Sequence, residues 1–329
     1  MRRIRLILVL ALGLALTACA AQTAQVPETT LIPGTDPVLP AAADTDILRV
    51  REDATLWFRF QDEPYLAPET RTIVQLNGQS YEEALLTSLF AGPGTQYVEL
   101  RSAFPQGVRV AAVTRQGRTL LVTLSREFLN GLGDEPANWR EDRAWSQEMP
   151  LRRRLAMQSL VATVTENCDV DEVIVLLEQD EDLKASMWLE QSWFLDGSEG
   201  SEPAPPQTRD DSCLLTPSVT GDAILTCWLR RDWKRLYRYV APADAYSGEK
   251  RPEYADFVTL MESLPVLTDF SAAGWSVSRD GLETTLSVQI AIRSADGGSR
   301  QMDARILRLR RDSGLWRIGI SSLTDWLEV

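Results

Sequence analysis

The chain of 329 residues is 44% hydrophobic and 25% charged, which is ordinary for globular proteins and long enough for about two domains. It contains no histidine, which excludes Ser-His-Asp and Cys-His nucleophile pairs, histidine zinc ligands and HExxH metalloprotease chemistry. The net charge of −13 argues against a nucleic-acid-binding protein, because such a protein needs a basic face. The composition therefore favours a binding or scaffolding protein over an enzyme.

The N-terminal residues predict a secretion signal. A basic segment, residues 1–5, precedes an apolar run from Leu6 to Leu16 that is too short to span a membrane. The run ends in Leu16-Thr17-Ala18-Cys19, which resembles the lipobox of bacterial lipoproteins. The resemblance implies a signal peptide at 1–18 and a diacylglyceryl thioether on Cys19, and two acyl chains give stable anchoring. The alternative is an ordinary secretory peptide with a chance cysteine.

Two segments without apolar periodicity divide the rest of the chain. Residues 19–45 are rich in Ala, Thr and Pro and predict a disordered tether behind the lipidated cysteine. Residues 197–217 are polar and Pro-rich and predict a linker. We therefore expect one domain at 46–196 and a second at 218–329.

The cysteines give little support to a redox or zinc site, because no CxxC pattern is present. If Cys19 is lipidated, Cys168, Cys213 and Cys227 remain, and this odd number allows at most one disulfide within the chain. A Cys213–Cys227 disulfide and three free or buried thiols both stay open.

The expected elements of the first domain, in chain order, are strands at 55–60 and 66–76, a helix after Ser80, a hairpin with strands at 108–112 and 120–124, a helical turn at 128–129, a polar loop at 130–150, a helix at 151–165, and strands at 173–177 and 186–195. Ser80 and Glu83 fit a capping box, and Ala91-Gly92-Pro93-Gly94 is a stop signal for that helix. The turn of the hairpin is expected at 115–117.

Four segments of this domain, in the same order, resemble GerMN domains. They are Leu85–Pro93 (LLTSLFAGP), Leu100–Val108 (LRSAFPQGV), Leu121–Phe128 (LVTLSREF) and Gln158–Val173, which contains TVTENCDVDEV. The resemblance covers most of residues 50–195. It implies a small α/β, ring-building module of lipoproteins connected with sporulation and germination, without catalytic residues that could be carried over. Thr123, where an acidic residue is common, and the long loop at 130–150 depart from the family pattern.

The second domain shows helices first and then long alternating strands, which is an α+β pattern. The expected elements are a helix at 221–240 capped by Thr220, a helix from Pro252, and strands near 275–277, 282–292, 302–310 and 316–320. This order of elements resembles NTF2-like or cystatin-like domains, whose concave face can hold a ligand. Trp228, Trp233 and Trp275 either line such a pocket or belong to the core.

One basic run is a candidate contact site. Arg152, Arg153 and Arg154 open the expected helix at 151–165, where positive charge opposes the helix dipole. They either contact an acidic partner or lipid headgroups, or they form an exposed face.

Together these observations predict two small mixed α/β domains, hence an α+β fold, in a lipoprotein on the outer face of the cytoplasmic membrane. We expect a non-enzymatic assembly or interaction module in sporulation or spore germination, with envelope or spore-assembly proteins as partners and a homo-oligomer left open. No catalytic residue, metal, cofactor or nucleic acid is expected. The alternative is a small-molecule or solute-binding lipoprotein that uses a pocket in its C-terminal domain. A polysaccharide hydrolase with two facing carboxylates ranks third.

Overall fold

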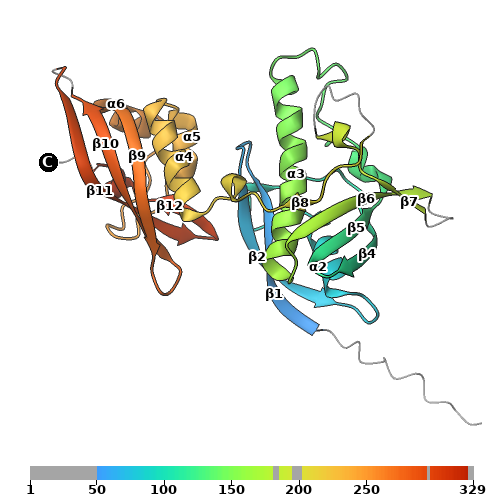
Figure 1. Cartoon of the computed structure of the whole chain (residues 1–329). Coiled ribbons are helices and arrows are strands. Elements are labelled where there is room, and N and C mark those ends of the chain that lie inside the picture. Colours follow the sequence, from blue (N-terminus) through green and yellow to red (C-terminus); the bar gives the residue numbers. More distant parts are fainter. Residues whose placement is uncertain (1–49, 181–184, 195–201, 295–296, 325–329) are drawn as a thin grey trace, which may run out of the picture. The chain divides into compact units, whose positions relative to one another are not determined.

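A computed structural model describes residues 50–180, 185–194, 202–294 and 297–324 (Figure 1). The expected signal peptide, Cys19 and the expected tether lie outside the described residues. Helices combine with antiparallel and mixed sheets, so the predicted α+β class is confirmed. In the described ranges, no helix is both long and apolar enough to cross a membrane.

The first domain contains two sheets. The first has the order β2-β1-β3, and the second has the order β4-β5-β6-β7 with β8 beside β6. The strands are β1 (Val50–Phe60), β2 (Leu66–Gln75), β3 (Leu100–Arg101), β4 (Val110–Gln116), β5 (Thr119–Leu124), β6 (Glu172–Asp180), β7 (Ala185–Trp188) and β8 (Gln207–Thr208). β5 and β6 are parallel, and α3 (Trp145–Asn167) lies in the crossover between them.

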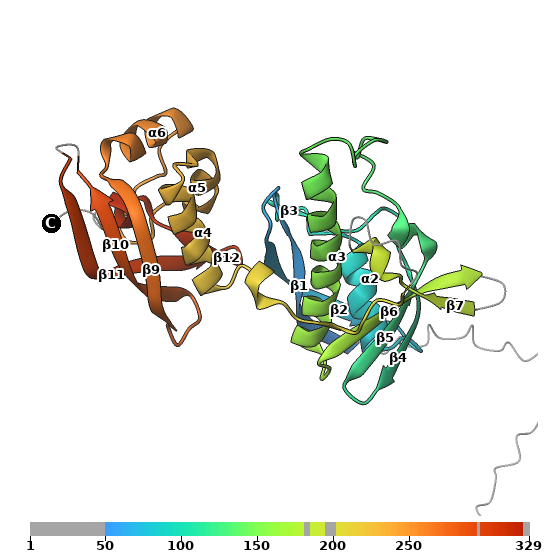
Figure 2. The ribbon, with the colours of Figure 1, turned by 45° about the horizontal axis from the view of Figure 1, so that its top comes forward.

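The helix after Ser80 forms as predicted. α2 (Tyr81–Phe90) begins where the Ser80 side chain accepts a hydrogen bond from the Glu83 N–H, and it ends before Gly92, which has a φ of +82°. Figure 2 shows α2 beside α3. The hairpin also forms, but its turn is Gly117-Arg118 and not 115–117. Gly117 adopts a φ of +63°, which two-residue hairpin turns favour.

The prediction for α3 is wrong at its start. The helix begins at Trp145, not at residue 151, and Pro150 lies inside it. Asp142 sets this start, because its side chain accepts hydrogen bonds from the N–H groups of Ala144 and Trp145 (2.8 and 3.0 Å). Pro150 removes one backbone hydrogen bond near the helix N-terminus without ending the helix. We expected the arginines at 152–154 to open the helix. They instead follow its first two turns.

A row of polar side chains on α3 completes the hydrogen bonding of β1. β2 pairs with β1 along its length, whereas β3 reaches only its last two residues on the other edge. Beyond β3, Asn167 bonds both the N–H (2.9 Å) and the C=O (2.7 Å) of Thr55. Thr163 accepts from the Trp57 N–H (3.0 Å), and Ser159 donates to the Trp57 C=O. The helix thus takes the place of a neighbouring strand along this edge.

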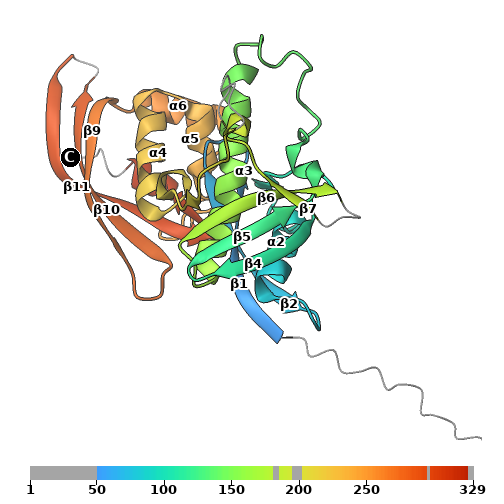
Figure 3. The same cartoon turned by 45° about the vertical axis from the view of Figure 1, so that its right-hand side comes forward.

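The second domain packs three helices on one face of a sheet with the order β12-β11-β10-β9 (Figure 3). Its elements are α4 (Pro217–Leu229), α5 (Trp233–Tyr239), α6 (Tyr254–Ser263), β9 (Val266–Val277), β10 (Glu283–Arg293), β11 (Ser299–Asp312), β12 (Leu315–Ile318) and α7 (Ile320–Thr324). Buried and exposed residues alternate along β10, as expected for a sheet with one covered face.

The prediction of a single helix at 221–240 is wrong, because this segment forms two helices, α4 and α5. Arg231 adopts a φ of +56° at the break, and Asp232 then caps α5 through a hydrogen bond from the Arg235 N–H (3.2 Å). The first cap is Thr216 before Pro217, not Thr220. Trp228 and Trp233 are buried in the core, whereas Trp275 is exposed on β9. The two buried tryptophans therefore follow the core interpretation.

The expected linker is partly structured. Within residues 202–216, β8 pairs with the start of β6, and Leu214 is fully buried. The Leu215 N–H donates to the Leu66 C=O (2.8 Å) at the start of β2. These contacts tie the segment before α4 to the first domain.

The contact between α3 and β1 gives a direct test. We expect Thr163→Val to lower the free energy of unfolding by about 1–3 kcal/mol, because the buried Trp57 N–H loses its acceptor while side-chain volume is kept. Thr165→Val is the matched control, since the Thr165 hydroxyl bonds only carbonyls of its own helix. Denaturant unfolding of both variants measures the difference. Equal stability of the two variants would contradict the role of Thr163.

Candidate interaction site

A cavity of about 370 Å³ lies beside the N-terminal half of α3. We call it the α3 cavity. The residues that matter most for its chemistry are Phe128, Trp139, Met149, Arg152, Arg153 and Trp193. Residues 129–132 form part of its wall, so the long loop that departs from the GerMN pattern builds this cavity.

Aromatic rings and one arginine form the floor of the α3 cavity. The Phe128 and Trp193 rings stack with centroids 4.8 Å apart. The guanidinium carbon of Arg153 lies 5.5 Å from the Trp139 ring centre and 5.8 Å from that of Trp193. Arg153 also donates a hydrogen bond to the Trp193 carbonyl (2.9 Å). Trp and Arg are residue types that protein interfaces favour.

Arg152 organises the loop instead of facing a partner. Its guanidinium lies 2.6 Å from Asp134, 2.8 Å from Glu148 and 3.8 Å from Glu135. Burial alone would lower the pKa of Arg152, but the hydrogen bonds that it donates to Asp134 and Glu148 raise its pKa above the ordinary value. Hydrogen bonding by Arg152 lowers the pKa of Asp134. Arg152, Asp134 and Glu148 are therefore charged at neutral pH.

The three predicted contact arginines do not all line one cavity. Arg152 lies in its ion pairs, Arg153 lies against the two tryptophans, and Arg154 is exposed. Arg154 lines a second cavity of about 520 Å³, together with Pro150, Leu151, Phe194 and others. Arg152 and Arg153 thus line the α3 cavity and Arg154 lines the second one, and their contact with a partner stays a prediction.

The lining of the α3 cavity includes two exposed leucines. Leu129 and Leu132 both line it, and they are 41% and 36% exposed. Glu135 holds this part of the loop, because its carboxylate accepts hydrogen bonds from the N–H groups of Leu132 and Gly133. A fixed loop therefore presents apolar side chains to solvent, which is a feature of binding surfaces.

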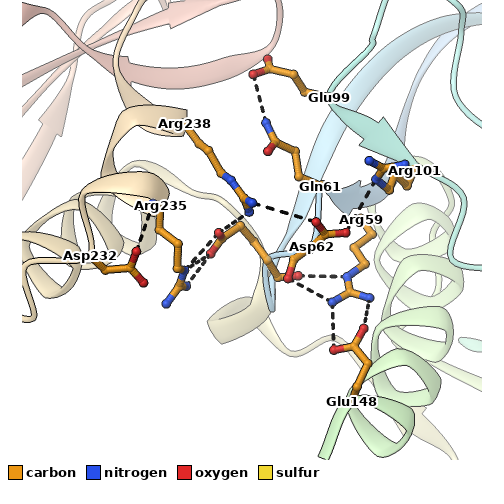
Figure 4. Close-up of polar contacts among 10 residues, drawn as sticks. Arg59, Gln61, Asp62, Glu99, Arg101, Glu148, Asp232, Arg235 and Arg238 are labelled. Atoms are coloured by element: carbon orange, nitrogen blue, oxygen red, sulfur yellow. Dashed lines mark hydrogen bonds and ion pairs between the residues drawn. The ribbon is translucent and has the colours of Figure 1, made fainter. Parts of the chain in front are cut away.

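A buried charge cluster lies at the turn between β1 and β2 (Figure 4). The Glu63 carboxylate is 1% exposed and bonds Arg235 of α5 (2.8 Å from Nε) and Arg238 (2.8 Å). Arg59 donates to the Glu63 carbonyl (3.1 Å) and pairs with Glu148 of α3 (2.6 Å). Each buried charge thus has an oppositely charged partner, which is what burial of ions requires.

The cysteines are unsuited to nucleophilic chemistry. Cys168, Cys213 and Cys227 are all free, so the disulfide that the sequence left open does not form. Burial raises the pKa of Cys168 and Cys213 to about 12 and that of Cys227 to about 11. These groups remain thiols at neutral pH. In the part of the chain that the structure describes, no group of three Asp, Glu or Cys residues is placed to hold a metal ion.

Sequence reasoning missed the partners that build the α3 cavity. Trp139 was noticeable as an aromatic residue in a polar loop, but its contact with Arg153 depends on how the loop packs against α3. Trp193 comes from a segment about 40 residues further along the chain. Spacing within a sequence gives no signal for that approach.

Glu148 makes a pH-dependent contribution to stability. Burial would raise its pKa, but hydrogen bonds from Arg59 and Arg152 lower it below the ordinary 4.5. Its contribution is therefore complete above pH 4.5 and is lost as pH falls through the lowered value. We expect Glu148→Gln to cost about 1–3 kcal/mol at pH 7, because Arg59 stays buried without its carboxylate.

The measurement is urea unfolding of wild type and Glu148→Gln at pH 7 and pH 3. The gap between them should shrink at pH 3, because this pH lies below the ordinary 4.5 and the contribution of the lowered pKa is being lost. Glu141→Gln, at an exposed loop position, should change little at either pH. A gap of the same size at both pH values would contradict the assignment.

Comparison with known proteins is consistent with the GerMN resemblance. Residues 55–182 match the family model Germane, described as "Sporulation and spore germination". No curated protein matches the sequence. Among solved structures, the tandem GerMN domains of the sporulation protein GerM from Bacillus subtilis align at 15% identity with a TM-score of 0.32, covering 52% of this chain. The chain spans about half (49%) of that structure.

Two further structures align at 15% identity over 49% of this chain, each with a TM-score of 0.28. A putative lipoprotein from Clostridium perfringens is covered to 89%, and the first GerMN domain of Bacillus subtilis GerM is covered to 98%. The family match lies within the expected GerMN domain at 46–196 and relates the chain to sporulation and spore germination. Residues 55–182 of this chain are therefore GerMN-like, as the match to the Germane family model shows.

Proposed function

We propose that the chain is a non-enzymatic assembly module in sporulation or spore germination, held at the outer face of the cytoplasmic membrane by a lipid on Cys19. The family match of residues 55–182 carries this proposal. The chemistry of the first domain supports a module without catalysis. Asp134, Glu148 and Glu166, on and around α3, are held in pairs with arginines, and the cysteine thiols stay protonated.

The α3 cavity is the surface that we assign to the protein partner. It combines exposed leucines, buried aromatic rings and an arginine on a loop fixed by Glu135. An apolar side chain of a partner would fill the cavity and cover Leu129 and Leu132. The loop is the part of this domain that departs most from the GerMN pattern, so it gives this chain a contact surface of its own.

The partner surface is tested by complementation in the host. We expect Leu129→Asp/Leu132→Asp to lower spore yield or germination about as much as deletion of the gene. Burying two unpaired carboxylates in an interface would cost binding free energy. Val98→Asp is the matched control, since Val98 is 86% exposed in the same domain and away from the cavity lining. It should complement fully.

Two outcomes count against the proposal in different ways. If the deletion strain sporulates and germinates normally, the assignment to sporulation is wrong. If the deletion is defective and the double leucine variant complements fully, the α3 cavity is not the partner surface.

The membrane anchor has its own test. We expect radioactive palmitate to label the wild-type protein in its host and not the Cys19→Ala variant, because the variant lacks the sulfur that carries the acyl group. Fractionation should then find wild type with membranes and the variant released from them. Absence of label from wild type would contradict the anchor and leave the assignment of the α3 cavity untouched.

A further inference from the structure

The second domain contains a cavity that differs in chemistry from the concave pocket expected there. It has a volume of about 680 Å³, within the range of small-ligand sites. Four of its lining residues are arginines: Arg308, Arg310 and Arg311 of β11, and Arg317 of β12. Segment 241–246, which follows α5, provides another part of the lining. We call it the arginine cavity.

Strand geometry places three of the four arginines, Arg308, Arg310 and Arg317, on one face of the sheet. Leu307 and Leu309 are buried, whereas the alternate residues Arg308 and Arg310 are exposed on the opposite face of β11. Arg317 lies directly across from Arg310 in the β11–β12 ladder. The pairing of two strands therefore places cations of both at one face.

The segment that lines the cavity with Tyr246 is firmly held. Asp244 is buried and accepts hydrogen bonds from the N–H groups of Tyr246 (2.8 Å), Ser247 (3.1 Å) and Ser321 (3.1 Å). Burial would raise the pKa of Asp244, but these hydrogen bonds lower it, so Asp244 stays an acceptor at neutral pH. Tyr246 is thereby placed with its ring centre 6.0 Å from the guanidinium carbon of Arg308.

The arginine charges are only partly balanced by acidic residues. Arg310 lies 3.7 Å from Glu283, and Arg317 pairs with Glu99 and lies 3.6 Å from Asp312. For Arg308 and Arg311, the described residues provide aromatic rings and, for Arg311, the Gly314 carbonyl (3.4 Å), but no carboxylate within 4 Å.

Arg317 differs from these two, because it has carboxylate partners but keeps one buried donor without a hydrogen bond. Its side chain is 5% exposed, and its buried Nε atom has no hydrogen-bond acceptor among the described residues. A buried donor without an acceptor is costly unless a ligand or water supplies one. In a chain with a net charge of −13, this concentration of cations is a local exception.

We propose that the arginine cavity binds a ligand that carries phosphate groups. A guanidinium group forms bidentate hydrogen bonds to phosphate oxygens, and neighbouring arginines can bind the same phosphate. Arg308 and Arg311 supply the charge that acidic residues leave unbalanced, and Arg317 supplies the buried donor. The phosphate belongs either to a soluble phosphate compound or to a phospholipid headgroup, and the chemistry of recognition is the same for both.

The test uses inorganic pyrophosphate as the soluble probe, and vesicles of phosphatidylcholine with or without phosphatidylglycerol as the lipid probe. Every protein sample carries Cys19→Ala, so that no acyl chain drives vesicle binding. Titration calorimetry and vesicle sedimentation compare the parent with Arg308→Gln/Arg311→Gln. The matched control is Arg293→Gln/Arg300→Gln, which removes two exposed arginines of the same sheet outside the cavity lining.

We expect at least one probe to bind the parent. Its affinity should fall at least about tenfold in Arg308→Gln/Arg311→Gln and should be unchanged in the control. Pyrophosphate binding without vesicle binding identifies a soluble phosphate compound, and the reverse identifies a headgroup. Binding of neither probe to the parent, or equal loss in both variants, would overturn the proposal. Thermal unfolding shows whether the variants are folded. A third variant, Tyr246→Phe, should bind the same probe as the parent, because the aromatic ring beside Arg308 remains.

Discussion

The first domain depends on how the open edge of β1 is satisfied. A strand edge inside a domain must find partners for its N–H and C=O groups. Here Ser159, Thr163 and Asn167, four residues apart on one face of α3, provide them for Thr55 and Trp57. Because side chains replace a strand, the helix axis is fixed along β1 as closely as a hydrogen-bonded ladder would fix it. The same helix links β5 to β6, so both sheets are positioned through α3.

The interaction site follows from that constraint. The N-terminal half of α3 carries Glu148, Arg152 and Arg153, so a helix held along β1 places these charges against the loop and the β1–β2 turn. Glu148 joins two arginines, one on β1 and one on its own helix. Acidic residues of the chain thus form ion pairs that order the site. The exposed leucines remain available to a partner.

Local signals in the sequence predicted the elements that end in strong caps or alternate regularly. The Ser80 cap, the stop at Gly92 and the alternating strand β10 could be placed in this way, whereas most of β9, which was expected only near 275–277, could not. The start of α3 could not, because Asp142 caps it upstream of a proline that usually marks a beginning. Nor could the arginine cavity, since it depends on how β11 pairs with β12 and on the fixed segment at Asp244.

The central claim is that α3 acts as the missing neighbour of β1 and thereby sets the interaction site. Amide hydrogen exchange of Thr55 and Trp57 tests it most directly, because both N–H groups bond side chains of α3 and not a strand. We predict that these two amides exchange as slowly as the amides inside the β1–β2 ladder. Exchange at the rate of an unpaired strand edge, while the β1–β2 ladder stays protected, would contradict the account.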